Sequence, residues 1–327
     1  MVHHILKATC ETVHFGGFSP EIKPALLIHS SDTVEVETFS GFQIYNKAPK
    51  EFLAAEFLEI CHNLPRERRV GNGPHLLTGP IFINGAEPGD VLEVKLHSVT
   101  PRLAVGFNAI RPGWGALTER FGEGHLRFIY LDLEAGVAEF PEGSGIKIPI
   151  RPFFGIMGVA TSNIRSSVPP GDYGGNIDNP ELQAGSSLFL PGALFSIGDG
   201  HAAQGDGEVC GTAIETSMNG TIELVLHKNM KLNMPFAETP TDIVTTGYAA
   251  TLDEALQIAL NGMVDFLVDT TGMTDQEAYC LCSLAANFRV TQVVNSPQKG
   301  IHGLLPKSLF SNFPSKQLFW SAMVRNH

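Results

Sequence analysis

The chain is poor in cysteine. Its 327 residues include five, an odd number with no Cys-x-x-Cys pair: Cys10, Cys61, Cys210, Cys280 and Cys282. A disulfide framework needs paired cysteines in a short secreted chain, so this pattern excludes one. It indicates a reduced, intracellular chain in which most cysteines are small core residues.

Positive charge is also scarce. Lysine and arginine total 22 against 34 aspartates and glutamates, which gives a formal charge of −12. Binding to nucleic acid or to an acidic membrane surface requires clustered basic side chains. We therefore expect neither kind of partner.

Long apolar runs are missing as well. No stretch approaches the roughly 18 apolar residues that a membrane-spanning helix needs. The first residues, MVHHILKATCETVHF, contain no apolar core of the kind found in signal peptides. These absences predict a cytoplasmic protein.

Glycine and proline are plentiful, at 34 and 21 residues, and 43% of the chain is hydrophobic. This composition favours short strands and tight turns around a sizeable core. Residues 33–39 alternate apolar and acidic side chains like a half-buried strand. Residues 79–96 predict strand, turn and strand around Pro88-Gly89, and residues 50–61 predict one short helix.

Residues 212–228 predict a β-hairpin. Asn219-Gly220 is the favoured pair for a two-residue type I′ turn. Counting back from that turn pairs Glu215 with Leu224, on an apolar face. We therefore expect Glu215 to be buried, either ion-paired for structural reasons or as a catalytic acid with a shifted pKa.

Helical patterns begin after residue 240. Thr251 and Thr274 each stand three residues before a glutamate, as in a capping box, and precede helices that run to about Leu267 and Ala286. Residues 289–294 then return to strand.

The order of these elements predicts a mainly β protein with a smaller α+β C-terminal portion. No repeat or low-complexity linker interrupts the chain. We expect one unit over residues 1–327, with a β-rich core that holds the site in residues 1–228 and the α+β portion in residues 229–327.

The densest group of possible ligands lies in residues 198–208, GDGHAAQGDGE. Side chains at i and i+2 point to the same side of an extended chain. Three pairs have this spacing: Asn176 and Asp178, Asp199 and His201, and Asp206 and Glu208. Carboxylates, an imidazole and an amide oxygen, without thiolates, form a donor set typical of a divalent cation.

Turn chemistry is the competing interpretation, because Gly-Asp-Gly is a frequent turn sequence. It explains Asp206 and Asn176 more simply than metal binding does. For Asp199 and His201 we favour function, because packing explains a histidine beside glycine poorly. Cys210 and Ser186-Ser187 are also candidate nucleophiles, but each has a simpler interpretation. Cys210 is explained as a small buried strand residue, and Ser186-Ser187 as part of a turn.

Six segments carry a wider resemblance: GPIFINGAEPGDVLEV, PFFGIMGVA, PPGDYGGNIDNPELQAGSSLFLP, GALFSIGDGHAAQGDGEVCGTAIE, RVTQVVN and GIHGLLPKSLF. In this order, over residues of about 20 to 310, they resemble the acetamidase/formamidase family. The resemblance implies a β-sandwich-like fold, a bound divalent metal and homo-oligomers, here a homodimer or a dimer of dimers. It also implies hydrolysis of a small primary amide, such as formamide or acetamide, to a carboxylate and ammonia.

The resemblance also implies a set of site residues, at Asn176, Asp178, Asp199, His201 and Glu208, with Glu215 nearby. We expect Asp199, His201 and Asp178 to bind the metal, with zinc as the first choice and calcium as the alternative. Glu208 or Glu215 would move the proton. Asn176 would stabilise the oxyanion.

A second hypothesis is an impaired family member that binds a small ligand or serves as an assembly subunit. Family members commonly carry carboxylates near Ser40 and at Asn287, and a longer segment in the region of residues 188–196. Those departures motivate the hypothesis, and the complete GDGHAAQGDGE segment argues against it.

Overall fold

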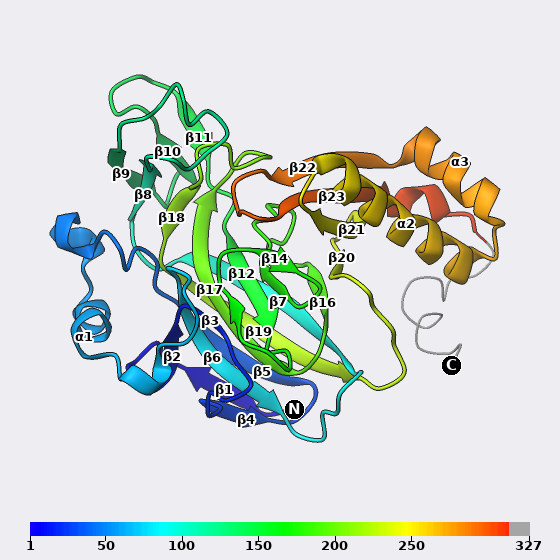
Figure 1. Cartoon of the computed structure of the whole chain (residues 1–327), viewed down its shortest axis with the longest axis horizontal. Helices are drawn as coiled ribbons and strands as arrows, with labels where there is room; N and C mark the ends of the chain where they lie inside the picture. The colour runs from blue at the N-terminus through cyan, green and yellow to red at the C-terminus, as the bar shows by residue number, and fades with distance from the viewer. Residues whose placement is uncertain (314–327) are drawn as a thin grey trace.

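The computed structural model describes residues 1–313 of the chain. Two large β-sheets pack across a common apolar core, with α1 beside the N-terminal strands and α2 and α3 over the C-terminal strands (Figure 1). The predicted mainly β fold with a smaller α+β C-terminal portion is confirmed.

The first sheet has nine strands and contains both early and late parts of the chain. Its order is β1 (His3–Leu6), β5 (Asp32–Glu37), β19 (Met218–His227), β7 (Val91–Pro101), β16 (Ser187–Pro191), β20 (Phe236–Glu238), β21 (Asp242–Ala249), β23 (Lys299–Pro306) and β22 (Asn287–Gln292). β1 pairs with β5 in parallel, and the other neighbours are antiparallel.

The second sheet has twelve strands. Nine follow the order β11 (Lys147–Pro149), β10 (Val137–Glu139), β9 (His125–Asp132), β8 (Val105–Ile110), β18 (Ile214–Thr216), β17 (Leu194–Ala203), β12 (Phe153–Val159), β15 (Gly174–Asn176) and β14 (Pro170–Gly171). β6 (Leu76–Ile83) pairs with β17, β2 (Val13–Phe15) and β4 (Leu26–Ile28). β3 (Gly17–Phe18) and β13 (Arg165–Ser166) form a separate pair.

The main core lies between the two sheets. Leu92, Val94 and Leu96 of β7 are fully buried, and they share a cluster with Phe154 and Ile156 of β12. Strands with one apolar face bury that face by packing against a second sheet. This core holds β12 and β17, the strands that carry the site, in fixed register.

Three α-helices lie in residues 1–313: α1 (Ala55–Asn63), α2 (Leu252–Thr271) and α3 (Asp275–Ala285). Four short 3-10 helices accompany them: η1 (Tyr45–Lys47), η2 (Lys50–Phe52), η3 (Arg66–Arg68) and η4 (Lys307–Phe310). The helix predicted at 50–61 is therefore a 3-10 turn followed by an α-helix displaced towards its C-terminus.

Both predicted C-terminal helices begin at the expected threonines. The Thr251 hydroxyl accepts from the Glu254 amide, and Thr274 and Glu277 form a complete capping box. α2 then packs directly on β21, where a Cβ at Gly247 would lie 2.0 Å from the Ala255 carbonyl oxygen. The predicted return to strand is β22, which starts two residues earlier than expected.

The predicted hairpin at Asn219-Gly220 is wrong. Neither residue has the positive φ of a type I′ turn, and both lie inside β19, paired with β5 and β7. The glycine serves sheet packing instead, because a Cβ there would lie 2.8 Å from the Phe154 ring of the facing sheet. The chain changes sheets at Ser217, so Glu215 belongs to β18 and does not face Leu224.

The single unit over 1–327, divided near residue 228, stays a prediction, and its last residues, 314–327, lie outside the described part. The nine-stranded sheet is compatible with it, because β21 to β23 continue the sheet that β1 and β5 begin. Within residues 1–313, no helix is both long and apolar enough to cross a membrane.

Candidate functional site

Neighbouring strands of the twelve-stranded sheet bring the predicted site residues together. β17 carries Asp199 and His201, and Glu215 on β18 stands directly opposite His201. On the other side of β17, β12 pairs with β15, which ends at Asn176 and leads to Asp178. Glu208 returns to the site in the loop after β17.

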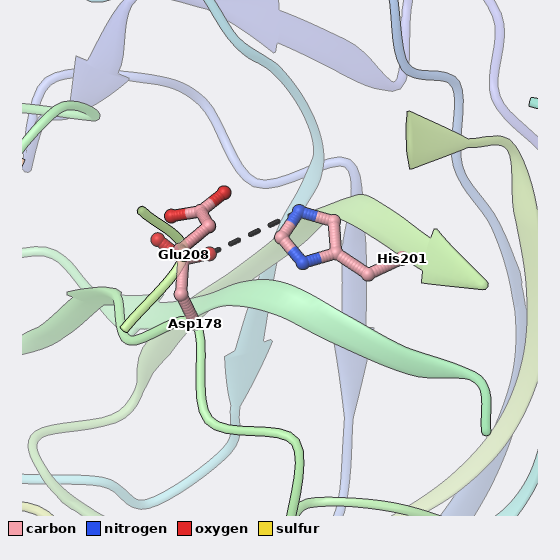
Figure 2. A group of neighbouring side chains, drawn as sticks. All are labelled: Asp178, His201 and Glu208. Carbon is pink, nitrogen blue, oxygen red and sulfur yellow. Dashed lines mark ion pairs between the residues drawn. The ribbon is translucent and has the colours of Figure 1, made fainter. Parts of the chain in front are cut away.

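His201 is at the centre of the site and is fully buried (Figure 2). Its Nε2 atom lies 3.2 Å from Glu215 Oε2, 3.3 Å from Asp199 Oδ2 and 3.9 Å from Asp178 Oδ1. Figure 2 shows the ring pointing from β17 towards Asp178, with Glu208 beside it.

The ligand atoms form two groups that share His201. Asp178 and Glu208 belong to one group, and Asp199 and Glu215 to the other; within each, all three ligand atoms lie within 4.8 Å of one another. The expected set of Asp178, Asp199 and His201 therefore spans both groups.

Four buried polar atoms of this site have no hydrogen-bond partner: His201 Nε2, Asp178 Oδ1, Glu208 Oε2 and Asn176 Oδ1. A buried polar group without a partner costs about 1–3 kcal/mol. Three of them, from His201, Asp178 and Glu208, belong to residues whose ligand atoms lie within 4.8 Å of one another, which is the arrangement expected of a cation site.

The backbone of the site is strained. Only four non-glycine residues in 1–313 have positive φ, and three of them are Asp178, Asp199 and Glu208, at 49°, 52° and 45°. A non-glycine residue in this region costs roughly 1–3 kcal/mol, and such residues concentrate at functional sites. The strain aims these carboxylates inward.

Gly155 on β12 has no side chain, and the Asp178 and His201 side chains occupy the space where one would lie. A Cβ at this position would lie 2.6 Å from Asp178 Oδ1 and 2.9 Å from His201 Cε1. Any other residue at position 155 therefore displaces at least one of these two side chains.

Two amide side chains missed in the sequence support the site. His201 Nδ1 lies 2.9 Å from Gln204 Oε1, and Gln204 Nε2 donates to the Asp178 backbone carbonyl at 2.8 Å. Since that carbonyl only accepts, the Gln204 oxygen must face His201, so Nδ1 carries a proton. In the neutral ring, the Nε2 lone pair then points into the carboxylate cluster, where a bound cation would accept it.

The second amide is Asn295, which donates from Nδ2 to Asp178 Oδ2. Its loop is fixed by Gln292, whose Oε1 accepts from the backbone amides of Val294 and Asn295 at 2.9 Å. No spacing pattern links Asn295 to Asp178, because 117 positions separate them. Gln204, in contrast, lies inside the GDGHAAQGDGE segment.

A small cavity of about 30 Å³ opens beside the cluster. Asn176, Asp199, Glu208 and Glu215 all line it. One water needs roughly 10–15 Å³ of such volume, so the cavity suits molecules of only a few non-hydrogen atoms.

Comparisons with known proteins agree with this picture. A model of the acetamidase/formamidase family matches residues 7–166 and 163–312. The chain belongs to the acetamidase/formamidase family. It is similar to a Yersinia enterocolitica acetamidase of known structure, with a TM-score of 0.80 and 31% identity over 95% of this chain and 93% of that one.

Two further relatives are similar at lower identity. A recombinant predicted acetamidase/formamidase from Thermoanaerobacter tengcongensis has a TM-score of 0.80 and is 29% identical, covering 94% of this chain and 97% of that one. The acetamidase of Mycolicibacterium smegmatis is 28% identical over 46% of this chain. The chain spans 63%, 52% and 51% of the length of the three curated relatives that it matches.

Burial is the largest cause of the pKa shifts of the acidic residues at this site. It raises the pKa of Asp178 to about 7; His201 opposes this shift, and Asp199 and Glu215 add to it. Burial also raises the pKa of Glu215, and it raises the pKa of Glu208 well above its usual value. The protein interior therefore cannot hold all four carboxylates ionised without a compensating cation.

Asp199 and His201 shift in the opposite sense. Burial alone would raise the pKa of Asp199, but His75 and His201 hold it below its ordinary value. Burial opposes protonation of His201, yet Glu215 and Asp199 keep its pKa well above the usual value. Both shifts show that this site favours positive charge at its centre.

The weaker sequence candidates lie apart from the cluster. Cys210 does not line the small cavity. Its sulfur accepts from Asn108 Nδ2 at 3.4 Å. Ser186 donates to the Gln183 carbonyl at 2.6 Å in a turn, and Asp206 is exposed. Ser40 does line the cavity, and its hydroxyl accepts from the Gly200 amide at 3.0 Å.

Gly155→Ala should disrupt the site and leave the fold intact. The added methyl group must displace Asp178 or His201, so we expect zinc affinity to fall at least about tenfold and stability to fall by about 1–3 kcal/mol. Zinc affinity by chelator competition and denaturant unfolding measure the two effects. Gly205→Ala is the matched control, because nothing lies within 4 Å of its Cβ position. Equal zinc affinity in both variants would contradict the role given to Gly155.

Metal affinity should depend on pH. Below pH 7, Asp178 is protonated in the metal-free protein, with a pKa of about 7, and must lose its proton to bind an ion. Affinity should therefore fall by about tenfold per pH unit for each proton displaced as the pH drops below 7. Calorimetry in buffers of different ionisation enthalpy measures the released protons. An affinity that stays constant from pH 5.5 to 8 would contradict this, because it would show that Asp178, Glu208 and His201 release no proton when the ion binds.

Proposed function

We propose that this protein is an amidase that hydrolyses a small primary amide, such as formamide or acetamide, to a carboxylate and ammonia. The observation that carries the proposal is the set of buried atoms without a hydrogen bond on His201, Asp178, Glu208 and Asn176, next to a cavity of about 30 Å³. Membership of the family supports the reaction class, and relatives of this chain are named acetamidase and formamidase.

The donor set fits a divalent ion, and we propose zinc, with calcium as the alternative. Carboxylate oxygens suit both ions, but an imidazole ligand favours zinc over calcium. We propose His201, Asp178 and Glu208 as ligands, because each offers a buried atom that makes no hydrogen bond and the three lie in one group. The set predicted from sequence, with Asp199 in place of Glu208, is the alternative assignment.

A divalent ion at this position would lower the pKa of a bound water from 15.7 towards about 7. The protein's own groups then handle the proton. Glu215 is buried, lines the cavity and is anchored at Oε1 by the Ala213 amide at 3.0 Å. Its raised pKa suits a group that takes the proton of the attacking water and passes it to the amide nitrogen.

The bonds balance in this scheme. The water oxygen bonds to the amide carbon, Glu215 carries one water proton to the nitrogen, and the carbon–nitrogen bond breaks to release ammonia. The carboxylic acid that remains loses the second water proton to solvent and becomes the carboxylate. Asn176 lines the same cavity, and we propose that its amide group donates to the carbonyl oxygen as negative charge develops there.

A homodimer or dimer of dimers, and a cytoplasmic location, stay predictions. The alternative of an impaired, ligand-binding family member is an outcome of the tests below. Asn287, one of the departures that motivated it, is exposed at the start of β22. Ser40, at a second departure, lines the cavity, and its hydroxyl accepts from the Gly200 amide of β17.

The ligand assignment predicts an order of zinc affinities. Glu208→Gln should weaken zinc binding at least about tenfold more than Asp199→Asn, since only Glu208 is proposed to bind the ion. Chelator competition on each purified variant measures this, with the exposed Asp206→Asn as the control. The reverse order would assign the ion to Asp178, Asp199 and His201 instead.

Glu215→Gln should fold and bind zinc but lose turnover. Without a group to move the proton, we expect ammonia release from formamide and acetamide to fall roughly 10²–10⁴-fold. Glu142→Gln, an exposed carboxylate outside the cavity, is the control. Near-full turnover of Glu215→Gln would make Glu215 a structural group.

The same assay tests the proposed function itself. Chelation should abolish ammonia release, and added zinc should restore it. Undiminished activity in metal-free protein would overturn the metal-dependent mechanism. Stoichiometric zinc without turnover of any short amide would favour the ligand-binding alternative.

A further inference from the structure

Acidic side chains line the inner side of the small cavity beside the cluster. Asp199, Glu208 and Glu215 line it, together with the imidazole of His75. Arg111 is the only lysine or arginine among the lining residues. One fixed positive charge therefore faces a cavity whose other charged walls are acidic.

Arg111 has no charged partner of its own. Within residues 1–313, its side chain makes no hydrogen bond and no ion pair; its guanidinium lies 5.7 Å from the centre of the Trp114 ring. Guanidinium groups remain protonated at neutral pH and offer a planar array of donors. An unpaired array at a cavity is available to a ligand.

Backbone hydrogen bonds fix the loop that carries Arg111. Arg111 directly follows β8, which pairs with β18 through Phe107 and Glu215. The Trp114 amide donates to the Arg111 carbonyl at 3.0 Å, and the Ala116 amide donates to the Val209 carbonyl at 2.8 Å. These bonds tie the loop to the segment that follows Glu208.

We propose that Arg111 forms a carboxylate-binding subsite at this cavity. The inference rests on the proposed amidase function for its biological meaning, because amide hydrolysis turns a neutral substrate into a carboxylate. The carboxylate group comes from one of two sources: the product acid, or a second functional group on a substrate that is the monoamide of a dicarboxylic acid.

The other polar lining groups offer a carboxylate no such contact. Asp199, Glu208 and Glu215 repel a carboxylate when they are ionised, and they do not repel a neutral amide. A planar guanidinium can donate two parallel hydrogen bonds to a carboxylate, and this pairing is stronger than a neutral hydrogen bond. Trp114 restricts the guanidinium and so limits the entropy that binding costs.

The test measures carboxylate binding directly, on zinc-loaded protein in which Glu215→Gln prevents turnover of the amide ligands. Titration with sodium acetate gives the dissociation constant of acetate for this background alone and with Arg111→Met or Arg111→Lys added. We expect Arg111→Met to weaken acetate at least about tenfold relative to neutral propanamide, and Arg111→Lys to lie between. Arg120→Met is the matched control, because Arg120 is exposed on the same loop and does not line the cavity.

Malonamate, an amide that carries a carboxylate, distinguishes the two sources. A loss of acetate binding assigns the subsite to the product, and a loss confined to malonamate binding assigns it to the substrate. Changes below threefold for both ligands in Arg111→Met, or equal losses in Arg120→Met, would overturn the proposal. Because binding is measured without catalysis, a protein that hydrolyses no amide can still support or contradict the subsite.

Discussion

The site depends on one electrostatic constraint: buried acidic groups surround a single imidazole nitrogen. His201 Nε2 faces oxygens of Glu215, Asp199 and Asp178 at 3.2 to 3.9 Å, and the site is almost closed to water. Buried charges of one sign are stable only when they are neutralised or paired. Protons supply that neutralisation in the metal-free protein, and a cation supplies it in the proposed zinc form. Folding and metal binding are thus linked through the same atoms.

Much of the surrounding structure serves to hold this unfavourable arrangement. Three site residues adopt left-handed backbone conformations, and Gly155 provides the space beneath them. Support also comes from the far end of the chain, where Asn295 donates to Asp178 across 117 positions. The C-terminal strands and helices are therefore part of the site's construction, because the loop that carries Asn295 starts at the end of β22. A local strain of several kcal/mol is sustained only when distant packing fixes it.

The sequence predicts the site better than it predicts the connections. Asp199 and His201 do lie together, 3.3 Å apart, but not for the predicted reason, because the chain is not extended at Asp199, whose φ is 52°. The hairpin prediction is wrong. Asn219-Gly220 has a strong local turn preference, but packing against Phe154 also requires a glycine, and tertiary packing overrides local preference. Glu215 is buried as expected, but on β18, between β17 and β8, and not opposite Leu224. Asn295 escapes prediction, because an amide so distant in sequence leaves no pattern.

The same charge pattern bears on the choice of ligand. A cavity of about 30 Å³ admits only short chains. Asp199, Glu208 and Glu215 repel an anion there only to the extent that protons or a cation leave their charge uncompensated. In the proposed reaction an amide enters without charge, whereas its product is a carboxylate. The guanidinium of Arg111, which directly follows β8, would give that product, or a carboxylate on the substrate, one favourable contact in the proposed subsite. Arg111 and the acidic residues around β17 and β18 therefore act in opposite directions on a carboxylate in the cavity.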